Sequence, residues 1–242
     1  MANDLVAIDI SHWQPDPVDF AKVKAAGIIG VIHKATEGTG TVDDKLFSRA
    51  NKAMQAGLKW STYHFLRPGS LPQQMDFYLN TIDPVEGERV CLDYEDQGVH
   101  IGDLEYCVNY LLSKRPDLQI TIYSGHVLKE QLGSHDSPVL AKTSLWLAQY
   151  SSTPSWPTQV WPQWTLWQYT DKASVPGITG AVDGDRFNGS RENCAAWFGP
   201  ASEEPAPGPE PEMRTVKVKL DLETPDDVKI ELEVTQNGEL IS

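Results

Sequence analysis

The sequence predicts an α/β fold: an irregular eight-stranded β/α barrel, TIM-like but with an incomplete helix ring, followed by a C-terminal β-hairpin. Two observations predict it. Short apolar runs alternate with amphipathic helical segments through the first two thirds of the chain, which is typical of parallel strands joined by crossover helices. Three more apolar runs then follow with only loops between them. A doubly wound open sheet is the alternative, but eight strands without a phosphate-binding loop favour the barrel.

The first two thirds of the chain contain five predicted strands and five predicted helices. Each strand is a short apolar run, and each helix carries apolar residues three or four positions apart. Gly27 and Gly57 end the first two helices, and Pro72 lies in the first turn of the third. The strands are residues 5–8, 28–32, 59–65, 89–95 and 119–123, and the helices are residues 18–26, 44–56, 72–82, 103–113 and 126–132.

The remaining strands are predicted at residues 145–150, 164–169 and 180–183, and a polar loop is predicted at 35–40. The barrel, residues 1–199, is expected to be the catalytic domain. Residues 200–212 are rich in proline and glutamate, which predicts an extended linker.

Residues 213–242 form an acidic β-hairpin in this interpretation, because apolar and polar residues alternate on both sides of a Thr224–Asp227 turn. An isolated hairpin is only marginally stable in water. It therefore needs a partner: the barrel surface, a target, or a second copy of itself, which makes self-association through residues 213–242 a hypothesis.

Composition excludes several classes of protein. The net charge of −14 argues against a nucleic-acid partner. The chain has no apolar run near the roughly 20 residues that a membrane span needs, and its N-terminus has neither the basic region nor the apolar core of a signal peptide. Three cysteines indicate reduced thiols. The sequence contains no zinc-protease, Cys-x-x-Cys or dinucleotide motif, so we expect no metal and no cofactor.

Two acids mark the end of the fourth predicted strand. Asp93 and Glu95 alternate with Tyr94, so in a strand they share one face with Cα atoms about 6.5–7 Å apart. Carboxyl pairs that cleave glycosidic bonds are about 5–5.5 Å apart in retaining enzymes and about 6.5–9.5 Å apart in inverting ones. The alternative is a solvated, exposed strand end.

Two more acids are expected at the same mouth of the barrel. Asp9 ends the first strand and Asp183 ends the last, and these strands are neighbours in a closed barrel. Crowded carboxylates raise one another's pKa, so one of them can hold a proton near neutral pH. Hydrogen bonding at the rim is the alternative role. Other strand-end residues are candidate saccharide contacts, although rim packing or a surface ion pair would explain some of them: Lys34, Tyr63, Tyr123, Gln149, Trp167 and Gln168.

Seven segments between residue 5 and about residue 190 stand in a familiar order. They resemble those of glycoside hydrolase family 25 lysozymes, the Chalaropsis-type N-acetylmuramidases, many of which are phage or prophage endolysins. The family has an irregular β/α barrel and cleaves the β-1,4 bond between N-acetylmuramic acid and N-acetylglucosamine in peptidoglycan. The segments are Asp9–Gln14, Lys34–Gly38, Tyr63–Phe65, Leu92–Glu95, Trp146–Tyr150, Trp167–Tyr169 and Val182–Phe187.

The resemblance implies a role for each acid. Glu95 is the expected general acid, Asp93 and Asp183 stabilise charge or act as base or nucleophile, and Asp9 lines the same site. The stereochemical outcome stays open. A non-catalytic glycan-binding module is the alternative function. Without a signal peptide, an endolysin would be made in the host cytoplasm and act on the cell wall after release.

Overall fold

The computed structural model of the chain describes residues 5–200, 216–224, 227–236 and 239–240. The chain divides into two compact units, residues 1–205 and 206–242. Residues 201–212, which make up most of the predicted linker, lie outside the described residues.

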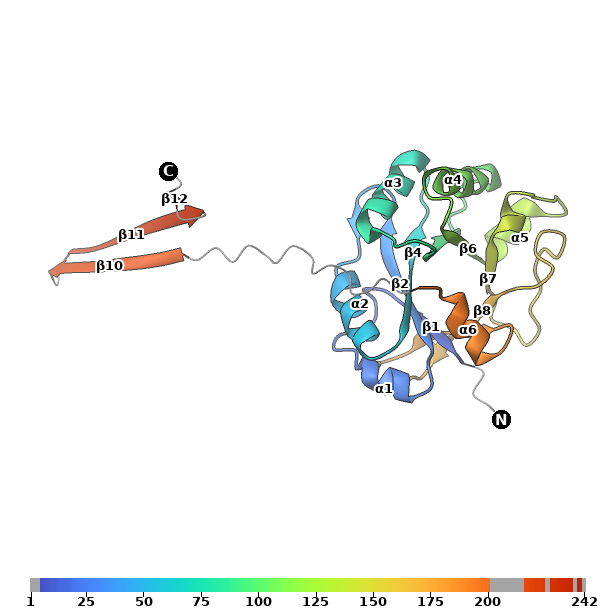
Figure 1. The fold of residues 1–242 in the computed structure, drawn as a ribbon, viewed down its shortest axis with the longest axis horizontal. Helices are drawn as coiled ribbons and strands as arrows, with labels where there is room; N and C mark the ends of the chain where they lie inside the picture. The colour runs from blue at the N-terminus through green and yellow to red at the C-terminus, as the bar shows by residue number, and fades with distance from the viewer. Residues whose placement is uncertain (1–4, 201–215, 225–226, 237–238, 241–242) are drawn as a thin grey trace. The chain divides into compact units, whose positions relative to one another are not determined.

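The first unit is a closed barrel of eight strands, so the predicted fold class is confirmed (Figure 1). The strand order is β1-β9-β8-β7-β6-β5-β4-β2, and pairing of β1 with β2 closes the ring. A short strand of two residues, β3, pairs with β2 outside the ring. The strands are β1 (Ala7–Ile10), β2 (Gly30–Glu37), β3 (Thr41–Val42), β4 (Lys59–Phe65), β5 (Arg89–Asp93), β6 (Gln119–Ser124), β7 (Ser144–Ala148), β8 (Leu166–Ala173) and β9 (Val182–Phe187).

One barrel strand runs against the others. Strand β9 is antiparallel to both β1 and β8, whereas the other neighbouring pairs of the ring are parallel. A parallel connection needs a crossover of a dozen or more residues, usually a helix. Residues 174–181 between β8 and β9 are too few for one, so the chain turns back on itself.

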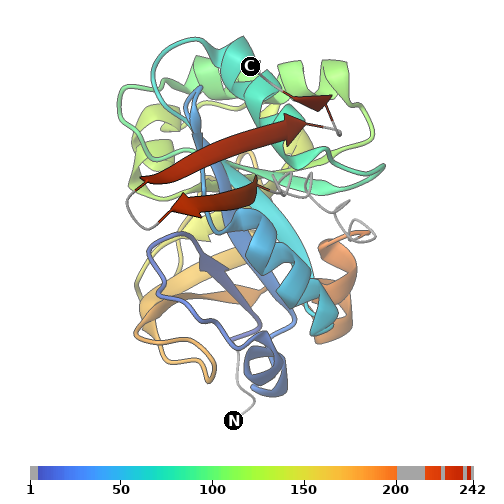
Figure 2. The same cartoon turned by 90° about the vertical axis from the view of Figure 1, so that its left-hand side faces the viewer.

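Helices cover the outside of the barrel (Figures 1 and 2). Helix α2 packs on β2 and β4, and α3 packs on β2 and α4. Their apolar faces and the outer faces of the strands form one buried cluster. The helices are α1 (Phe20–Ala25), α2 (Leu46–Gln55), α3 (Leu71–Ile82), α4 (Ile101–Lys114), α5 (His126–Leu132) and α6 (Arg191–Trp197), with a 3-10 turn at Leu140–Lys142.

A second apolar cluster fills the barrel interior, and α6 belongs to it. This helix was not predicted, although Ser190 at its N-cap, which accepts a bond from the Asn193 amide, is a recognisable signal. Phe198 follows α6 and packs on Gly30, where a Cβ would come within 2.4 Å of the ring. Trp197 stacks on Arg89, with the guanidinium carbon 4.3 Å from the ring centroid. The helix thus closes the end of the barrel where the parallel strands begin.

The predicted boundaries of the segments 35–40 and 89–95 are wrong. Strand β2 continues to Glu37 and turns back through Gly38 into β3, so residues 35–40 are not simply a loop. Strand β5 ends at Asp93, so Glu95 lies beyond the strand. The alternation argument for Asp93 and Glu95 therefore does not apply, because it requires both residues to be in one strand.

The second unit contains the predicted hairpin. Strands β10 (Val216–Thr224) and β11 (Asp227–Gln236) pair antiparallel, and β12 (Glu239–Leu240) adds a short third strand. In the described part of the chain, no helix is long and apolar enough to cross a membrane. All three cysteines are free and buried.

Candidate active site

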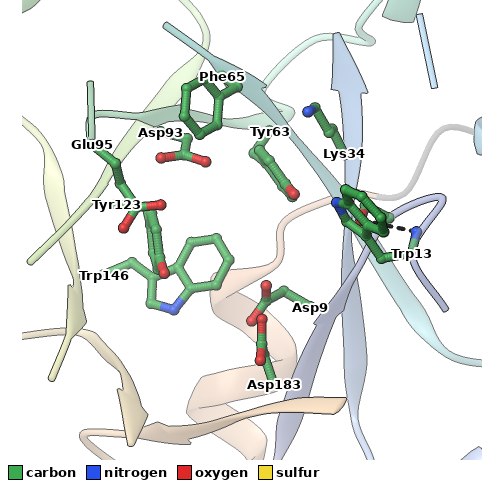
Figure 3. Close-up of a pocket in the computed structure, with 11 residues that line it drawn as sticks. Asp9, Trp13, Lys34, Tyr63, Phe65, Asp93, Glu95, Tyr123, Trp146 and Asp183 are labelled. Atoms are coloured by element: carbon green, nitrogen blue, oxygen red, sulfur yellow. Dashed lines mark hydrogen bonds between the residues drawn. The ribbon is translucent and has the colours of Figure 1, made fainter. Parts of the chain in front are cut away.

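A pocket of about 160 Å³ opens at the end of the barrel where the parallel strands finish (Figure 3). Asp9 and Asp183 lie on one side of it, and Asp93 and Glu95 lie across from them. The pocket therefore brings together the four acids predicted from the sequence. Its lining residues are Asp9, Ser11, Trp13, Lys34, Tyr63, Phe65, Asp93, Glu95, Tyr123, Trp146 and Asp183.

Strand pairing places Asp9 directly opposite Asp183. The prediction that Asp183 ends its strand is wrong, because it is the second residue of β9. It still reaches the mouth, because β9 is antiparallel and begins where its neighbours end. Burial, followed by the charges of Asp185 and Asp183, raises the pKa of Asp9 well above its ordinary value. Burial also raises the pKa of Asp183.

A fifth acid, Asp185, lies one layer deeper and was missed from the sequence. It is two residues beyond Asp183 on β9, so it faces the interior as well, and its exposed fraction is 0%. Its Oδ1 accepts a hydrogen bond of 2.6 Å from the Trp146 indole Nε1. Burial raises the pKa of Asp185 well above its ordinary value, and the charge of Asp183 adds to this. Asp9, Asp183 and Asp185 thus form a crowded group that favours shared protons.

Asp9 is held in place by Gln168. The Gln168 amide Nε2 donates to Asp9 Oδ2 at 2.8 Å. The amide oxygen accepts from two phenols, Tyr123 at 2.9 Å and Tyr150 at 2.8 Å. Because both hydroxyls occupy the oxygen, the amide nitrogen is directed at Asp9. Gln168 was predicted to bind substrate, but its exposed fraction is 1%, so it positions Asp9 instead.

Asp93 and Glu95 differ in their exposure. Asp93 is buried, and burial, followed by the charge of Glu95, raises its pKa well above the ordinary value. The Glu95 side chain reaches the solvent-open part of the pocket. Desolvation by the surrounding protein still raises the pKa of Glu95 above its ordinary value, and the charge of Asp183 adds to this. Glu95 therefore combines a carboxyl that holds its proton more tightly than usual with access to a ligand.

Lys34 contributes the positive charge on the pocket wall. Its ammonium pairs with Glu37 and lies 5.3 Å from the centroid of the Phe65 ring. Arg67 pairs with the same glutamate at 2.7 Å. Lys34 thus shares the one negative charge of Glu37 with Arg67, and the charge of Lys34 also lowers the pKa of Asp93.

Aromatic residues form much of the pocket lining, and three of them were or could have been noticed in the sequence. Tyr63 and Tyr123 line it with their rings largely buried, as predicted for strand-end contacts. Trp13 stands at the rim with an exposed fraction of 79%, the largest among the exposed hydrophobic side chains of the described residues. An exposed indole beside carboxylates offers a flat face for a sugar ring. The sequence interpretation passed over it, although it follows Asp9 by only four residues.

Two predicted substrate contacts lie elsewhere. Trp167 is 4% exposed and packs in the wall between β7 and β9, with its Nε1 donating to the Gln149 carbonyl at 2.7 Å. It faces outward because it alternates with the inward-facing Gln168. Gln149 is not among the residues that line this pocket, and its Nε2 donates to Ser151 Oγ at 2.8 Å. Trp167 therefore does not line the pocket and cannot stack on a sugar bound there. The described residues contain no group of His, Cys, Asp and Glu suited to a metal ion.

Comparison with known proteins identifies the family of this chain. Residues 8–178 match the Glycosyl hydrolases family 25. The chain belongs to this family. This family 25 enzyme is a glycoside hydrolase, and the acids of its pocket come from the strand ends of an irregular barrel.

Similar proteins support the assignment along most of the barrel. Lysozyme M1 of Streptomyces globisporus is 28% identical over 202 residues, which is 76% of this chain and 67% of that protein. The solved bacterial lysozyme of Streptomyces coelicolor is 28% identical with a TM-score of 0.70, covering 81% of this chain and 97% of the other. The CTP1L endolysin is 25% identical with a TM-score of 0.66, covering 79% and 68%.

Proposed function

We propose that this family 25 enzyme is a lysozyme of the N-acetylmuramidase type. It hydrolyses the β-1,4 bond between N-acetylmuramic acid and N-acetylglucosamine in bacterial peptidoglycan. The observation that carries the proposal is the pocket in which Asp9, Asp93, Glu95 and Asp183 converge beside exposed Trp13. The similarity to proteins named lysozymes supports the choice of substrate.

Glu95 acts as the general acid in this proposal. Its pKa is raised, which favours the protonated form that a general acid needs, and its position beyond the end of β5 lets it reach the leaving oxygen. Those of Asp93, Asp183 and Asp9 that are ionised stabilise the positive charge that develops on the sugar ring, and one of them activates water or attacks the anomeric carbon. Trp13 supplies a stacking surface for a neighbouring sugar.

Digestion of purified peptidoglycan tests the proposal. The expected products carry muramic acid at their new reducing ends, which mass spectrometry of reduced fragments identifies. Glu95→Gln keeps the size and removes the proton donor, so we expect its rate to fall at least about a hundredfold. New glucosamine reducing ends, or new amino termini, would show a different bond specificity. Tight glycan binding without turnover by the wild-type chain would favour the non-catalytic binding module.

We further propose that the enzyme is an endolysin, made in a host cytoplasm and released to degrade the wall and lyse the cell. The similarity to the CTP1L endolysin supports this context. Expression in a bacterial host with and without a membrane-permeabilising protein tests it. Rapid lysis is expected only when both are present. Lysis by the enzyme alone would mean that it leaves the cytoplasm by another route.

The register of the C-terminal hairpin favours self-association through residues 213–242. Cross-strand pairs place Val216 opposite Val234, Val218 opposite Leu232, Leu220 opposite Ile230 and Leu222 opposite Val228. By strand alternation these eight aliphatic positions share one face, whereas the pairs Lys217–Glu233 and Lys219–Glu231 share the other. The sequence has no aromatic residue after Phe198, which makes this face a poor sugar platform and a good match for a second copy.

Sedimentation velocity of the full chain tests this association. We expect a dimer that Ile230→Glu converts to a monomer. Lys229→Gln is the matched control, because it changes the net charge by the same amount on the opposite face. A monomeric wild-type chain would exclude the association.

A further inference from the structure

A second hollow of about 270 Å³ adjoins the acidic pocket. The two share Glu95 and Tyr123, so a glycan that passes Glu95 enters both. The second hollow lies between α5 and the end of β7, and its remaining lining differs in charge from the first. It is lined by Glu95, Tyr123, Gly125, His126, Lys129, Ala148, Gln149 and Tyr150.

Lys129 gives this hollow a positive charge that neighbouring side chains do not neutralise. Its ammonium donates to the Gln149 amide oxygen, a neutral partner. The same oxygen accepts from the Ser155 amide at 3.1 Å, which fixes its direction. Among the described residues, no ion pair joins Lys129 to a carboxylate. Lys34 in the first pocket differs, because Glu37 pairs with it.

The positive charge of Lys129 stands out because the net charge of the protein is −14. The hollow has no aspartate in its lining, although the charges of Asp183 and Asp9 still reach Tyr150 there, and Lys129 is the one lysine or arginine in that lining. His126 is close enough to Glu95 that its charge lowers the pKa of that carboxyl. The side of Glu95 away from the aspartates is thus the side suited to an anionic group.

We propose that this second hollow binds a carboxylate carried by a muramic acid residue of the glycan strand, and that Lys129 is the residue that binds it. The inference rests on the proposed muramidase function. Muramic acid alternates with glucosamine, so each sugar next to Glu95 either bears a lactyl group or adjoins a sugar that does. The carboxylate belongs to the lactyl group itself or to the peptide attached to it. Tyr123 and Tyr150 also line this hollow.

Steady-state kinetics on three soluble glycans test the proposal. The first keeps its peptides, the second has been stripped of peptides so that the lactyl carboxylates are free, and the third is the second with those carboxylates converted to neutral amides. Lys129→Met removes the charge and keeps the length of the side chain, and Lys129→Arg keeps the charge. Lys52→Met, on the exposed side of α2, is the control for a change in net charge.

For Lys129→Met we expect KM to rise about tenfold on a carboxylate-bearing glycan with kcat unchanged, the size of effect of one charged hydrogen bond. Lys129→Arg and Lys52→Met should stay near wild type. If KM of Lys129→Met rises on the stripped glycan, the bound group is the lactyl carboxylate. If KM rises only on the glycan that keeps its peptides, the bound group is a carboxylate of the peptide.

The proposal would be overturned if KM of Lys129→Met rose as much on the neutral glycan as on the carboxylate-bearing ones, or if it stayed within twofold of wild type on all three. Thermal unfolding of each variant establishes that it is folded. A wild-type enzyme that cleaves none of the glycans would instead refute the proposed muramidase function, so the two failures are distinguishable.

Discussion

Replacing Asp185 by asparagine should stabilise the protein at neutral pH. Asp185 has an exposed fraction of 0%, and its Oδ2 has no hydrogen-bond donor while the neighbouring acids are ionised. Leaving a buried polar atom without a partner costs about 1–3 kcal/mol. In Asp185→Asn, Oδ1 still accepts from Trp146, and an amide donor replaces an oxygen in a group that interacts with Asp9 and is repelled by Asp183. We therefore expect a gain of about 1–3 kcal/mol, or a melting temperature higher by roughly 2–12 °C.

The sign of the pH dependence makes this prediction specific. The folded-state pKa of Asp185 is raised, so its contribution to stability is fully present below the unfolded pKa and is lost as pH rises through the folded value. The asparagine variant should therefore gain more at pH 7.5 than at pH 4. Calorimetry at both values measures this.

Asp185→Leu is the matched control. It removes the same charge but leaves the Trp146 indole N–H without an acceptor, so it should be about 1–3 kcal/mol less stable than the asparagine variant. An asparagine variant that melts below wild type at pH 7.5, or gains equally at both pH values, would refute the reasoning.

Three further predictions concern packing, burial and positioning. Gly30→Ala should cost about 1–3 kcal/mol in chemical denaturation, because its Cβ would meet the Phe198 ring, whereas Gly40→Ala, with nothing within 4 Å, should cost far less. Burial raises the pKa of Glu88 to about 7, so stability that is present near pH 4 is lost as pH rises through 7. Glu88→Gln should flatten that decline in pH-dependent melting curves, and an unchanged slope would contradict the assignment. Gln168→Leu removes the donor to Asp9 and should lower kcat about tenfold to a hundredfold. Because the Gln168 hydrogen bond lowers the pKa of Asp9, the acidic limb of the pH–rate profile should move to higher pH in this variant. Tyr150→Phe should lower kcat less, because Tyr123 still bonds to the same amide oxygen, and equal losses would exclude the positioning role.

Local sequence patterns were sufficient to locate the strands and the acids. Apolar runs predicted the eight strands of the barrel, because a strand buried on both faces must be apolar along its length. Polar residues at the ends of those runs then marked one mouth. Asp9, Asp93 and Glu95 could be identified in this way because the carboxyl ends of parallel strands meet at a common edge.

Only the tertiary structure decided in which direction each strand runs and which of its side chains face the barrel interior. The antiparallel course of β9 brings Asp183 to the mouth from the start of its strand and turns Asp185 into the interior. Gln168 and Trp167 are adjacent in β8, so their side chains lie on opposite faces of the strand. Gln168 therefore holds Asp9, whereas Trp167 packs in the wall. No local pattern states which way a strand runs or which face closes inward.

The sequence by itself thus determined the kind of fold and the residue types available for chemistry, because strand propensity and burial act over a few residues. Only the closed barrel decided which of those residues meet, because its pairings join segments far apart in the chain. Asp9 and Gln168 are 159 residues apart, yet one hydrogen bond of 2.8 Å joins them. The same closure requires a plug at the opposite end, which α6 and Phe198 supply.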